Sequence, residues 1–466
     1  MTGDLSGDLL IVGAGPAGMA AAVTARKAGL AVFVADEAPA PGGQIFRSVL
    51  APPAQSAALG PEYAAGATLA RTFSDCGARL LAGATVFMVE PGQEAGFETS
   101  LLINGSARRV LTRAVLIATG ALERPFPVPG WTLPGVMTAG AAQTMLKASG
   151  VVPSATLHLV GTGPLLYLLA AQYARLGVPV AALLDTTPRG NWAKALPHLP
   201  AFLTGSYAWK GIGLLREVLA STRVIRNVRN LSIHGQGRAE EIRCLAGGRA
   251  LSLPTETVLL HQGVVPQVNL AMACGVPHRW NPNRLAFEPE LGAAGETSRP
   301  GLYIAGDTGG IAGAQAAQHR GTLVALAILR DLGRDLSGLD LPDAVATERA
   351  LRKALRGRAF LDAFYRPLDE FRVPAEDDVV VCRCEEVRAG EIRSLARQGV
   401  QGPNQAKFFS RAGMGPCQGR LCGLTICETM AAETGRSPAE IGHMRVRAPV
   451  KPVTVGAMAA LSRDAA

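Results

Sequence analysis

The sequence predicts an α/β protein made of two Rossmann-like units and a small helical domain at the carboxyl end. The segment LLIVGAGPAGMAAA near the start reads as strand, glycine turn and helix, and the same order returns in LHLVGTGPLLYLLA from Leu157 onward. Two closely spaced cysteine pairs after Val381 indicate the third part. At 466 residues the chain is too long for a single compact core, which agrees with this division.

Composition narrows the classes of function. Hydrophobic residues make up 48% of the chain and glycines number 54, which is typical of a globular α/β protein with many tight turns. Aromatic residues are only 5%, and the net charge of +9 is not gathered into a run of like charges. Stacking platforms and basic tracts are therefore missing, and we expect no nucleic-acid partner.

The amino-terminal residues indicate a cytoplasmic protein. They carry Asp4 and Asp8 and no basic residue before Arg26, unlike a signal peptide. The apolar run Leu9–Ala25 is short for a membrane span and contains three glycines and a proline. In a reducing compartment structural disulfides are not expected, so we interpret Cys76, Cys244 and Cys274 as small core residues.

The first unit is centred on a G-x-G-x-x-G pattern in its expected context. We predict a strand over Leu9–Val12, a helix from about Pro16 to Ala28 with Gly29 at its end, and a strand ending at Asp36. The glycines permit a sharp turn, backbone approach to a pyrophosphate and close helix packing, while Asp36 can bond ribose hydroxyls and repel a 2′-phosphate. The predicted contacts are Gly13, Ala14, Gly15, Pro16, Ala17, Gly18, Asp36 and Glu37.

Later segments contribute to the same predicted site. PGGQIFR follows Asp36, AVLIATG ends a strand at Gly120, and GLYIAGDTGG ends another at Gly306 before a helix over about residues 313–332. Taken alone, Gly120 would be a turn residue and Asp307 a helix N-cap, but their order and spacing favour one nucleotide site.

The second unit departs from the pattern at one position. In Gly161-Thr-Gly163-Pro-Leu-Leu166 a leucine replaces the third glycine, and its side chain would hold helix and strand further apart. Asp185 still ends the next strand, so we expect the fold to be retained. Two alternatives stay open: this unit binds a nucleotide, or it no longer does so and is kept for packing or for docking a partner. No C-x-x-C pair occurs in this unit, which argues against a disulfide-reducing centre.

The cysteine pairs suggest a metal site. Cys382-x-Cys384 and Cys417-x4-Cys422 are separated by 32 residues, a pattern of four thiolates that suits zinc or an iron–sulfur cluster. The C-x-C and C-x4-C spacings are unusual for zinc, and the surrounding glycines would let backbone N–H groups reach cluster sulfides. All four cysteines are predicted ligands, whereas Cys427 falls within an apolar helix and is predicted to be a core residue.

These observations define five parts. The first unit covers residues 1–150 and 291–340, and the second covers 151–290. A charged connector at 341–378, with a helical centre near Ala344–Phe364, leads to the cysteine domain at 379–440. The tail, 441–466, is basic and punctuated by prolines, and we expect it to be extended rather than part of a core.

The motifs of the first unit resemble those of the two-dinucleotide-binding flavoproteins, whose fold is that of glutathione reductase. The resemblance covers about residues 8–335 and implies FAD in the first site. The additional contacts that this resemblance implies are Gly43, Gln44, Val86, Thr119, Gly120, Gly306 and Asp307. NAD or another adenine nucleotide is the alternative, because a Rossmann unit reads only the ADP moiety. VVCRCEEV and NQAKFFSRAGMGPCQGRLCG resemble the bacterioferritin-associated-ferredoxin-like [2Fe-2S] domain, although its second pair is often C-x2-C.

The whole chain resembles the α subunits of amino-acid dehydrogenases of the opine oxidase, D-hydroxyproline dehydrogenase and hydrogen cyanide synthase type. This resemblance implies an oxidoreductase subunit with no catalytic residue for amine oxidation of its own. A D-amino-acid-oxidase-like β subunit with FAD would bind and oxidise the small-molecule substrate, an opine, hydroxyproline, proline or glycine. This chain would pass the electrons through its cluster to an acceptor.

The resemblance also allows an FMN at a subunit interface near RVRAPVKPV, a small γ subunit, and a quinone acceptor with peripheral attachment to the inner membrane. Two other classes of function stay open. One is a self-sufficient NAD(P)H-dependent flavin and iron–sulfur reductase, against which Leu166 argues. The other is a non-redox scaffold with structural zinc.

Overall fold

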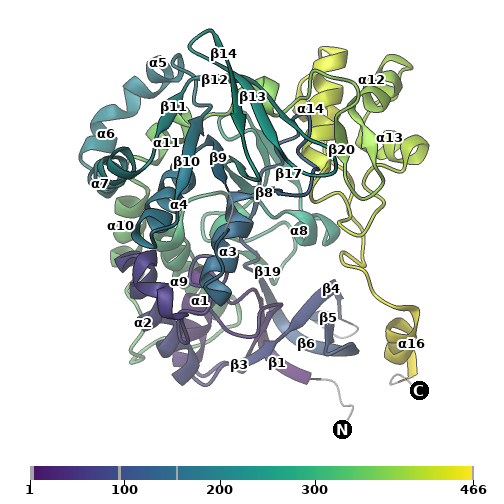
Figure 1. Cartoon of the computed structure of the whole chain (residues 1–466). Helices are drawn as coiled ribbons and strands as arrows, with labels where there is room; N and C mark the ends of the chain where they lie inside the picture. Colours follow the sequence, from purple (N-terminus) through teal and green to yellow (C-terminus); the bar gives the residue numbers. More distant parts are fainter. Residues whose placement is uncertain (1–4, 93–95, 154–155, 464–466) are drawn as a thin grey trace.

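The computed structural model describes residues 5–92, 96–153 and 156–463 (Figure 1). In the first sheet β1 (Leu5–Val12) lies between β2 (Val32–Asp36) and β6 (Ser106–Ile117) and runs parallel to both. The described strands follow the order β3-β2-β1-β6-β5-β4, and β19 (Leu302–Ile304) also pairs with β6. The sheet is completed by β3 (Arg79–Ala82), β4 (Ala84–Pro91) and β5 (Phe97–Ile103). The predicted βαβ start is confirmed, with the strand beginning earlier, at Leu5.

Two helices cover one face of this sheet at close range. They are α1 (Pro16–Lys27) and α9 (Ala314–Asp331), which match the two helices predicted for the unit. A β-carbon added at Gly321 of α9 would lie 2.1 Å from the Ala17 carbonyl oxygen of α1. The helix axes therefore approach so closely only because glycine stands at the contact. This packing fixes the first glycine turn against the turn that precedes α9.

The second sheet is parallel and has the order β11-β10-β9-β15-β8. Its strands are β8 (Val136–Thr138), β9 (Leu157–Thr162), β10 (Val180–Asp185), β11 (Val224–Arg226) and β15 (Thr257–Gln262). The predicted second βαβ repeat is β9, α4 (Pro164–Arg175) and β10. Because β8 pairs with β15, the chain enters the second sheet before Val136 and not at residue 150.

Smaller elements join and flank the two sheets. A short pairing of β7 (Ala121–Glu123) with β16 (Val264–Pro266) bridges them. The others up to the connector are 3-10 helices η1 (Ala54–Leu59), η2 (Leu196–His198) and η3 (Gly306–Gly309), helices α2 (Pro61–Asp75), α3 (Ala139–Ser149), α5 (Asn191–Ala195), α6 (Leu199–Leu203), α7 (Ser206–Ser221) and α8 (Asn269–Ala273), and strands β12 (Val228–His234), β13 (Glu241–Ala246), β14 (Arg249–Pro254), β17 (His278–Asn281) and β18 (Ala286–Pro289).

The connector contains two helices where the sequence predicted one helical centre. They are α10 (Ala344–Leu355) and α11 (Arg358–Phe364), followed by η4 (Asp369–Phe371). Gly357 separates them with a φ of +88°, a left-handed conformation that glycine adopts without steric cost. The break turns α11 back toward the second sheet.

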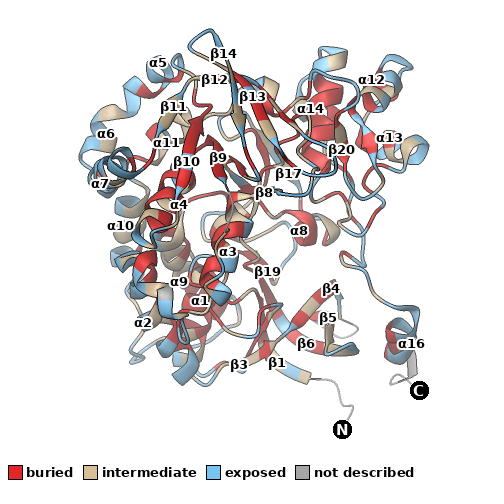
Figure 2. Ribbon diagram, viewed as in Figure 1, coloured by how far each residue is buried: buried red, intermediate tan, exposed pale blue. Residues whose placement is uncertain are grey.

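The cysteine domain is a small α-helical body whose apolar core also includes Val265 of β16 and Ala286 and Phe287 of β18 (Figure 2). It comprises β20 (Val380–Cys382), β21 (Val387–Arg388), α12 (Ala389–Arg397), α13 (Pro403–Ser410), α14 (Gly423–Thr434) and α15 (Pro438–Ile441). The prediction of an extended tail is wrong in part. Val446 and Val450 are buried against the first sheet, and the tail ends in α16 (Val455–Arg463), because its apolar residues find partners on distant strands.

A buried charge cluster clamps the cysteine domain to the rest of the chain. Glu428 of α14 pairs with Arg372 of the connector and lies 3.8 Å from Arg124, which follows β7. Arg124 also donates to the carbonyls of Arg284 and Leu285 at 2.9 and 2.8 Å. Since buried charges are costly unless paired, this cluster fixes how three parts of the chain meet. Within the described ranges no helix is long and apolar enough to cross a membrane.

Candidate functional site

The predicted nucleotide contacts of the first unit gather at the carboxyl ends of β1, β2, β6 and β19. In open α/β sheets ligands bind at this edge. A β-carbon added at Gly13 would lie 2.4 Å from the Ala118 oxygen, so the first glycine turn touches the end of β6. One added at Gly306 would lie 2.9 Å from the Ala17 β-carbon, which brings the last predicted segment to the start of α1.

The glycines of the first turn have different tasks. A β-carbon at Gly18 would lie 1.9 Å from the Gly13 oxygen, so this glycine is needed for packing. A β-carbon at Gly15 would meet nothing closer than the Gly43 α-carbon at 4.0 Å. Gly120, with φ of +75°, also faces open space. The open positions beside the amino end of α1 fit a pyrophosphate, which needs close approach to backbone N–H groups.

Asp36 is held by the backbone of its surroundings. Its Oδ2 accepts from the Ala14 N–H at 2.6 Å, and its Oδ1 accepts from the Ala38 N–H at 2.7 Å. A carboxylate has about four acceptor sites, so lone pairs remain for ribose hydroxyls. The carboxylate is therefore oriented at the rim of the glycine turn.

The late Gly306-Asp307 turn joins the site through two side chains. Asp307 Oδ1 accepts from the N–H groups of Ala312 and Gly313 at 2.8 and 3.1 Å, so it caps the turn that precedes α9. Thr308, which sequence reasoning missed, accepts from the Gly120 N–H at 2.7 Å. Its place directly after Gly306-Asp307 is the signal that could have identified it. The capping role of Asp307 does not itself indicate a ligand.

Gln44 faces the second unit through a buried lysine. Lys147 of α3 donates to the Gln44 carbonyl oxygen at 3.1 Å and to Gln143 Oε1 at 2.9 Å. Burial, with the charge of Arg47, lowers the pKa of Lys147 to about 8. Burial of an ammonium group with only neutral acceptors costs folding free energy, so Lys147 lowers the stability of the fold beside the predicted site.

The nucleotide crevice of the second unit is filled by the chain itself. The buried Asp185 accepts from the Tyr167 hydroxyl at 2.7 Å and from the Thr187 N–H at 2.8 Å. The predicted departure at Leu166 is a fully buried side chain in the same helix, α4. The carboxylate that would bind a ribose is thus buried, and a tyrosine side chain of the same unit bonds one of its oxygens.

The connector lies against this crevice. The buried Asn191 donates through Nδ2 to the carbonyls of Phe364 and Arg366 at 2.8 and 2.9 Å. Trp192 packs edge-on against Phe364, with ring centroids 4.9 Å apart. Burial, with the nearby Asp185 charge, raises the pKa of the Tyr365 phenol. The end of α11 therefore stands at the carboxyl end of β10, where the adenosine of a nucleotide would lie.

A histidine occupies the second glycine turn as well. His261 of β15 pairs through Nδ1 with Glu123 Oε1 at 2.5 Å, and Glu123 Oε2 accepts from the Gly140 N–H at 2.9 Å. A β-carbon at Gly163 would lie 3.3 Å from His261 Nε2. The imidazole thus stands next to the glycine that would face a pyrophosphate.

The four predicted cysteine ligands come together from two segments. Their thiols interact in the series Cys382–Cys422–Cys417–Cys384. Cys382 and Cys422 are buried, Cys417 is half-buried and Cys384 is exposed. Across the described part of the chain, no group of three or more His, Cys, Asp or Glu side chains has the arrangement expected around a metal ion. Charge interactions also join Cys382 with Cys417 and with Cys384, so the four thiols are neighbours of one another.

Hydrogen bonds stabilise negative sulfur in this series. A hydrogen bond from Cys422 lowers the pKa of Cys382 to about 6 and that of Cys417 to about 5, although burial opposes both shifts. Backbone N–H groups add to the effect, including that of Gly413, which lies 3.5 Å from Cys382 Sγ. The same contacts raise the pKa of Cys422. Thiolates that accept hydrogen bonds from N–H groups are the form of cysteine that binds metals and clusters.

The loop around the thiols depends on glycine. A β-carbon at Gly415 would lie 2.2 Å from the Cys384 β-carbon, so the two cysteine segments approach only because this side chain is missing. Cys427 is buried in α14, and burial raises its pKa to about 12, which confirms the prediction of a core residue. Cys244 and Cys274 are buried as predicted, whereas Cys76 is half-buried.

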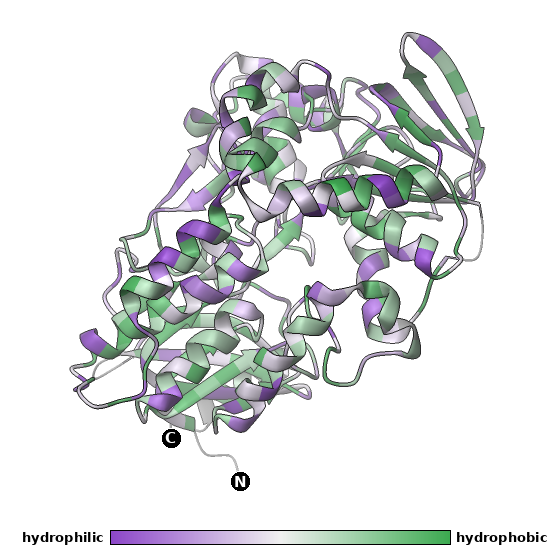
Figure 3. Cartoon of the chain, turned by 90° about the vertical axis from the view of Figure 1, so that its left-hand side faces the viewer, coloured by the Kyte–Doolittle hydropathy of each residue, from purple (hydrophilic) through white to green (hydrophobic). Residues whose placement is uncertain are grey.

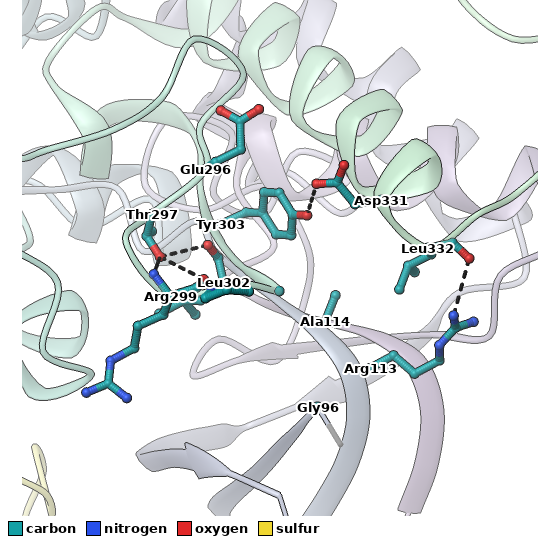
Figure 4. Close-up of a pocket in the computed structure, with 12 residues that line it drawn as sticks. Gly96, Arg113, Ala114, Glu296, Thr297, Arg299, Leu302, Tyr303, Asp331 and Leu332 are labelled. Atoms are coloured by element: carbon teal, nitrogen blue, oxygen red, sulfur yellow. Dashed lines mark hydrogen bonds between the residues drawn. The ribbon is translucent and has the colours of Figure 1, made fainter. Parts of the chain in front are cut away.

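A cavity lies far from these groups. It has about 430 Å³ and is lined by Arg113, Ala114, Tyr303 and Asp331, among others (Figure 4). It opens beside the amino-terminal part of β19 and the paired stretch of β6. Ligands of α/β sheets bind at the opposite edge, so we assign no site to it.

Comparison with family models places the chain. Residues 7–321 match the model of the pyridine nucleotide-disulphide oxidoreductases, and residues 378–462 match the sarcosine oxidase A3 domain. The chain belongs to the pyridine nucleotide-disulphide oxidoreductase family. It is therefore an oxidoreductase with the flavin- and nucleotide-binding fold that the sequence predicted. The second match joins the cysteine domain and the tail in one unit.

Individual relatives show which members of the family the chain resembles in sequence. The A subunit of opine oxidase from Agrobacterium tumefaciens (strain Ach5) is 46% identical over 98% of this chain and 92% of its own length. The HcnB subunit of hydrogen cyanide synthase from Pseudomonas aeruginosa is 31% identical over 98% of this chain and 99% of its own. The alpha subunit of sarcosine oxidase from Rhizobium meliloti is 28% identical over 97% of this chain but only 42% of its own length. The predicted kinship with these subunits is confirmed.

Solved structures agree on the fold. L-proline dehydrogenase from P. horikoshii matches with a TM-score of 0.72 at 20% identity, over 98% of this chain and 80% of the other. Thioredoxin reductase from T. acidophilum matches with a TM-score of 0.52 at 21% identity, over 71% of this chain and 99% of the other. The match to proline dehydrogenase therefore extends beyond the two sheets.

Proposed function

We propose that this chain is the electron-transfer subunit of a heteromeric, FAD-dependent dehydrogenase of amino acids or secondary amines. The substrate class is that of opines, D-hydroxyproline, proline or glycine. The observation that carries the proposal is the meeting of four cysteines from two distant segments in a chain that also has a nucleotide-binding turn. The names of the relatives, which are subunits of opine oxidase, hydrogen cyanide synthase and sarcosine oxidase, support it.

The first site is proposed to hold FAD. Gly15 and Gly120 leave room for the cofactor, and Asp36 is oriented toward the expected ribose position. The same geometry would accept the ADP part of NAD or another adenine nucleotide, which stays the alternative. The Gln44 segment supports the flavin, because it contacts Thr144 and Lys147 of α3 at the face toward the second unit.

The cysteine domain is proposed to hold a [2Fe-2S] cluster on Cys382, Cys384, Cys417 and Cys422. Two thiols with lowered pKa values and the N–H group of Gly413 support it. A flavin can accept two electrons together and release them one at a time, and a [2Fe-2S] cluster carries one electron at a time. The protein fixes the distance and the polarity around both groups. The exposed Cys384 would place one edge of the cluster toward solvent or a partner.

The electrons are proposed to come from a partner subunit and not from NAD(P)H. A nicotinamide nucleotide would need the crevice of the second unit. There Asp185 already bonds Tyr167, Asn191 holds the connector, and His261 stands against Gly163. This arrangement disfavours the alternative, a self-sufficient NAD(P)H-dependent reductase.

The proposed partner is an FAD-containing, D-amino-acid-oxidase-like β subunit that binds the substrate. An interface FMN, a small γ subunit and a quinone acceptor at the inner membrane belong to the same proposal. Exposed apolar surface on helix α7, which lies on the side of the molecule that faces the viewer in Figure 3, supports association with another protein. It includes Trp209, whose side chain is 75% exposed, with Ile212 and Leu219 on the same helix, α7.

Co-purification tests the proposal. Expressed with its neighbouring subunits, the chain should elute with a second flavoprotein, and the complex should oxidise one of the named amines. Metal analysis of the chain should give two irons and two acid-labile sulfides. Cys417→Ser should abolish the electron paramagnetic resonance signal of the reduced cluster while flavin absorbance stays. Stoichiometric zinc without sulfide would refute the cluster and favour the scaffold.

A further inference from the structure

The tail returns from the cysteine domain to the first unit. Figure 1 shows the yellow segment leaving the region of α14 and running beside β4, β5 and β6 to α16. Val446 and Val450 are buried in the same apolar cluster as Phe33 of β2 and Val86 of β4. The Arg109 side chain donates to the Leu461 carbonyl and so fixes α16 on the first sheet. The tail is thus docked along a defined path.

Two contacts of the tail fall beside predicted nucleotide contacts. The Val450 N–H donates to the carbonyl of Phe87 at 2.9 Å, and Phe87 follows Val86 directly. Lys451 Nζ lies 2.8 Å from Glu37 Oε1, and Glu37 follows Asp36 directly. Glu37 directly follows β2 and Phe87 belongs to β4, so the tail spans the region between the end of β2 and the start of β4.

This region is where the adenosine half of a dinucleotide belongs. The acid that ends the second strand of a Rossmann unit bonds the ribose of the adenosine, so the adenine lies close to Asp36. Two carboxylates, Asp36 and Glu37, stand near the place of an anionic pyrophosphate. The Lys451 ammonium offsets the charge of Glu37 there, which would otherwise oppose the ligand.

We propose that residues 446–451 form a wall of the adenosine pocket in the first site. Docking of the tail and binding of the adenine nucleotide then stabilise each other, because a coupling between two binding events is reciprocal. This inference rests on the proposed function of the first site. It adds a specificity element that lies more than 400 residues from the glycine turn in the sequence.

The tail also reaches the thiol series. Arg420, which lies between Cys417 and Cys422, donates to the Val450 carbonyl at 2.7 Å. Val450 therefore bonds Phe87 with its N–H and Arg420 with its carbonyl. One residue of the tail connects the proposed nucleotide pocket with the loop that carries two of the four thiols.

Limited trypsin digestion of the flavin-depleted full chain, with and without added FAD, tests the inference. Cleavage after the exposed Arg447 should slow at least fivefold when FAD binds, while cleavage after the exposed Arg189 in the second unit should not change. Val450→Asp should raise the Kd of FAD at least tenfold and remove the protection. Lys451→Ala should raise the Kd two- to fivefold, since the pair is partly exposed.

A matched variant gives the control. Val455→Asp makes the same change in the same tail at a side chain that is 85% exposed, and it should leave both the Kd and the protection unchanged. An unaltered rate of cleavage after Arg189 shows that each variant is folded. FAD binding without protection at Arg447 would overturn the inference alone. Failure of the wild-type chain to bind FAD, NAD+ or ADP would overturn the proposed function of the site and the inference with it.

Discussion

The charge cluster at Glu428 gives a prediction that depends only on the structure. The Glu428 and Arg124 side chains are 4% exposed and Arg372 is 8% exposed, so solvent screens them little. Glu428→Gln would leave the buried Arg124 guanidinium without a carboxylate and Arg372 with Asp369 alone. Breaking such a buried pair costs about 3–5 kcal/mol of folding free energy. Burial and the charges of Arg372 and Arg366 already lower the pKa of Arg124 to about 9.

The assay is thermal or urea unfolding that follows the cysteine domain separately. Because the chain has several parts, its visible absorbance and its far-ultraviolet circular dichroism should be recorded together. We expect the cysteine domain of Glu428→Gln to unfold first, well before the two sheets. Glu440→Gln, at an exposed acid of the same domain, is the control and should leave the unfolding midpoint close to that of the wild type. A cost for Glu428→Gln as small as that of this control would refute the clamp.

The remaining predictions concern the two sites and the buried lysine. Gly15→Ala should fold like the wild type but lose FAD, since its β-carbon would meet only the Gly43 α-carbon, at 4.0 Å. Gly18→Ala should lose stability as well, since its β-carbon would lie 1.9 Å from the Gly13 carbonyl oxygen. Unfolding experiments and the FAD content distinguish the two variants. Gly415→Ala should prevent cluster assembly, because its β-carbon would lie 2.2 Å from that of Cys384; iron content measures this, and full loading would contradict it. The pKa of Lys147 is lowered to about 8 from its usual 10.5, so between these two pH values the unfolded chain binds more protons than the folded chain. The free energy of unfolding should therefore rise with pH over this range by up to about 3 kcal/mol. Lys147→Met should lack this rise, and parallel pH profiles of the variant and the wild type would contradict the prediction.

Local patterns predicted the parts of the protein that depend on local geometry. The turn at Gly13, the strand end at Asp36 and the helix of Cys427 follow from periodicity, glycine positions and apolar spacing. The meeting of the cysteine pairs was also predictable, because four thiolates at such spacings have few uses in a reducing compartment.

Contacts between distant segments could not be predicted in this way. Nothing in the sequence near Lys451 shows that it pairs with Glu37, and nothing near Tyr365 shows that the connector fills the second crevice. The tail was expected to be extended because its prolines and charges mask the two valines that dock it. Leu166 indicated a changed second site, but the groups that close it come from β15 and the connector.

The central claim is that electrons enter this chain from a partner subunit. Anaerobic mixing of the purified chain with NADH or NADPH tests it most directly, with flavin absorbance and the paramagnetic resonance signal of the cluster as readouts. We predict that neither changes with the chain alone and that both change when the amine substrate is added to the assembled complex. Rapid bleaching of the flavin by NADH or NADPH in the chain alone would contradict the account.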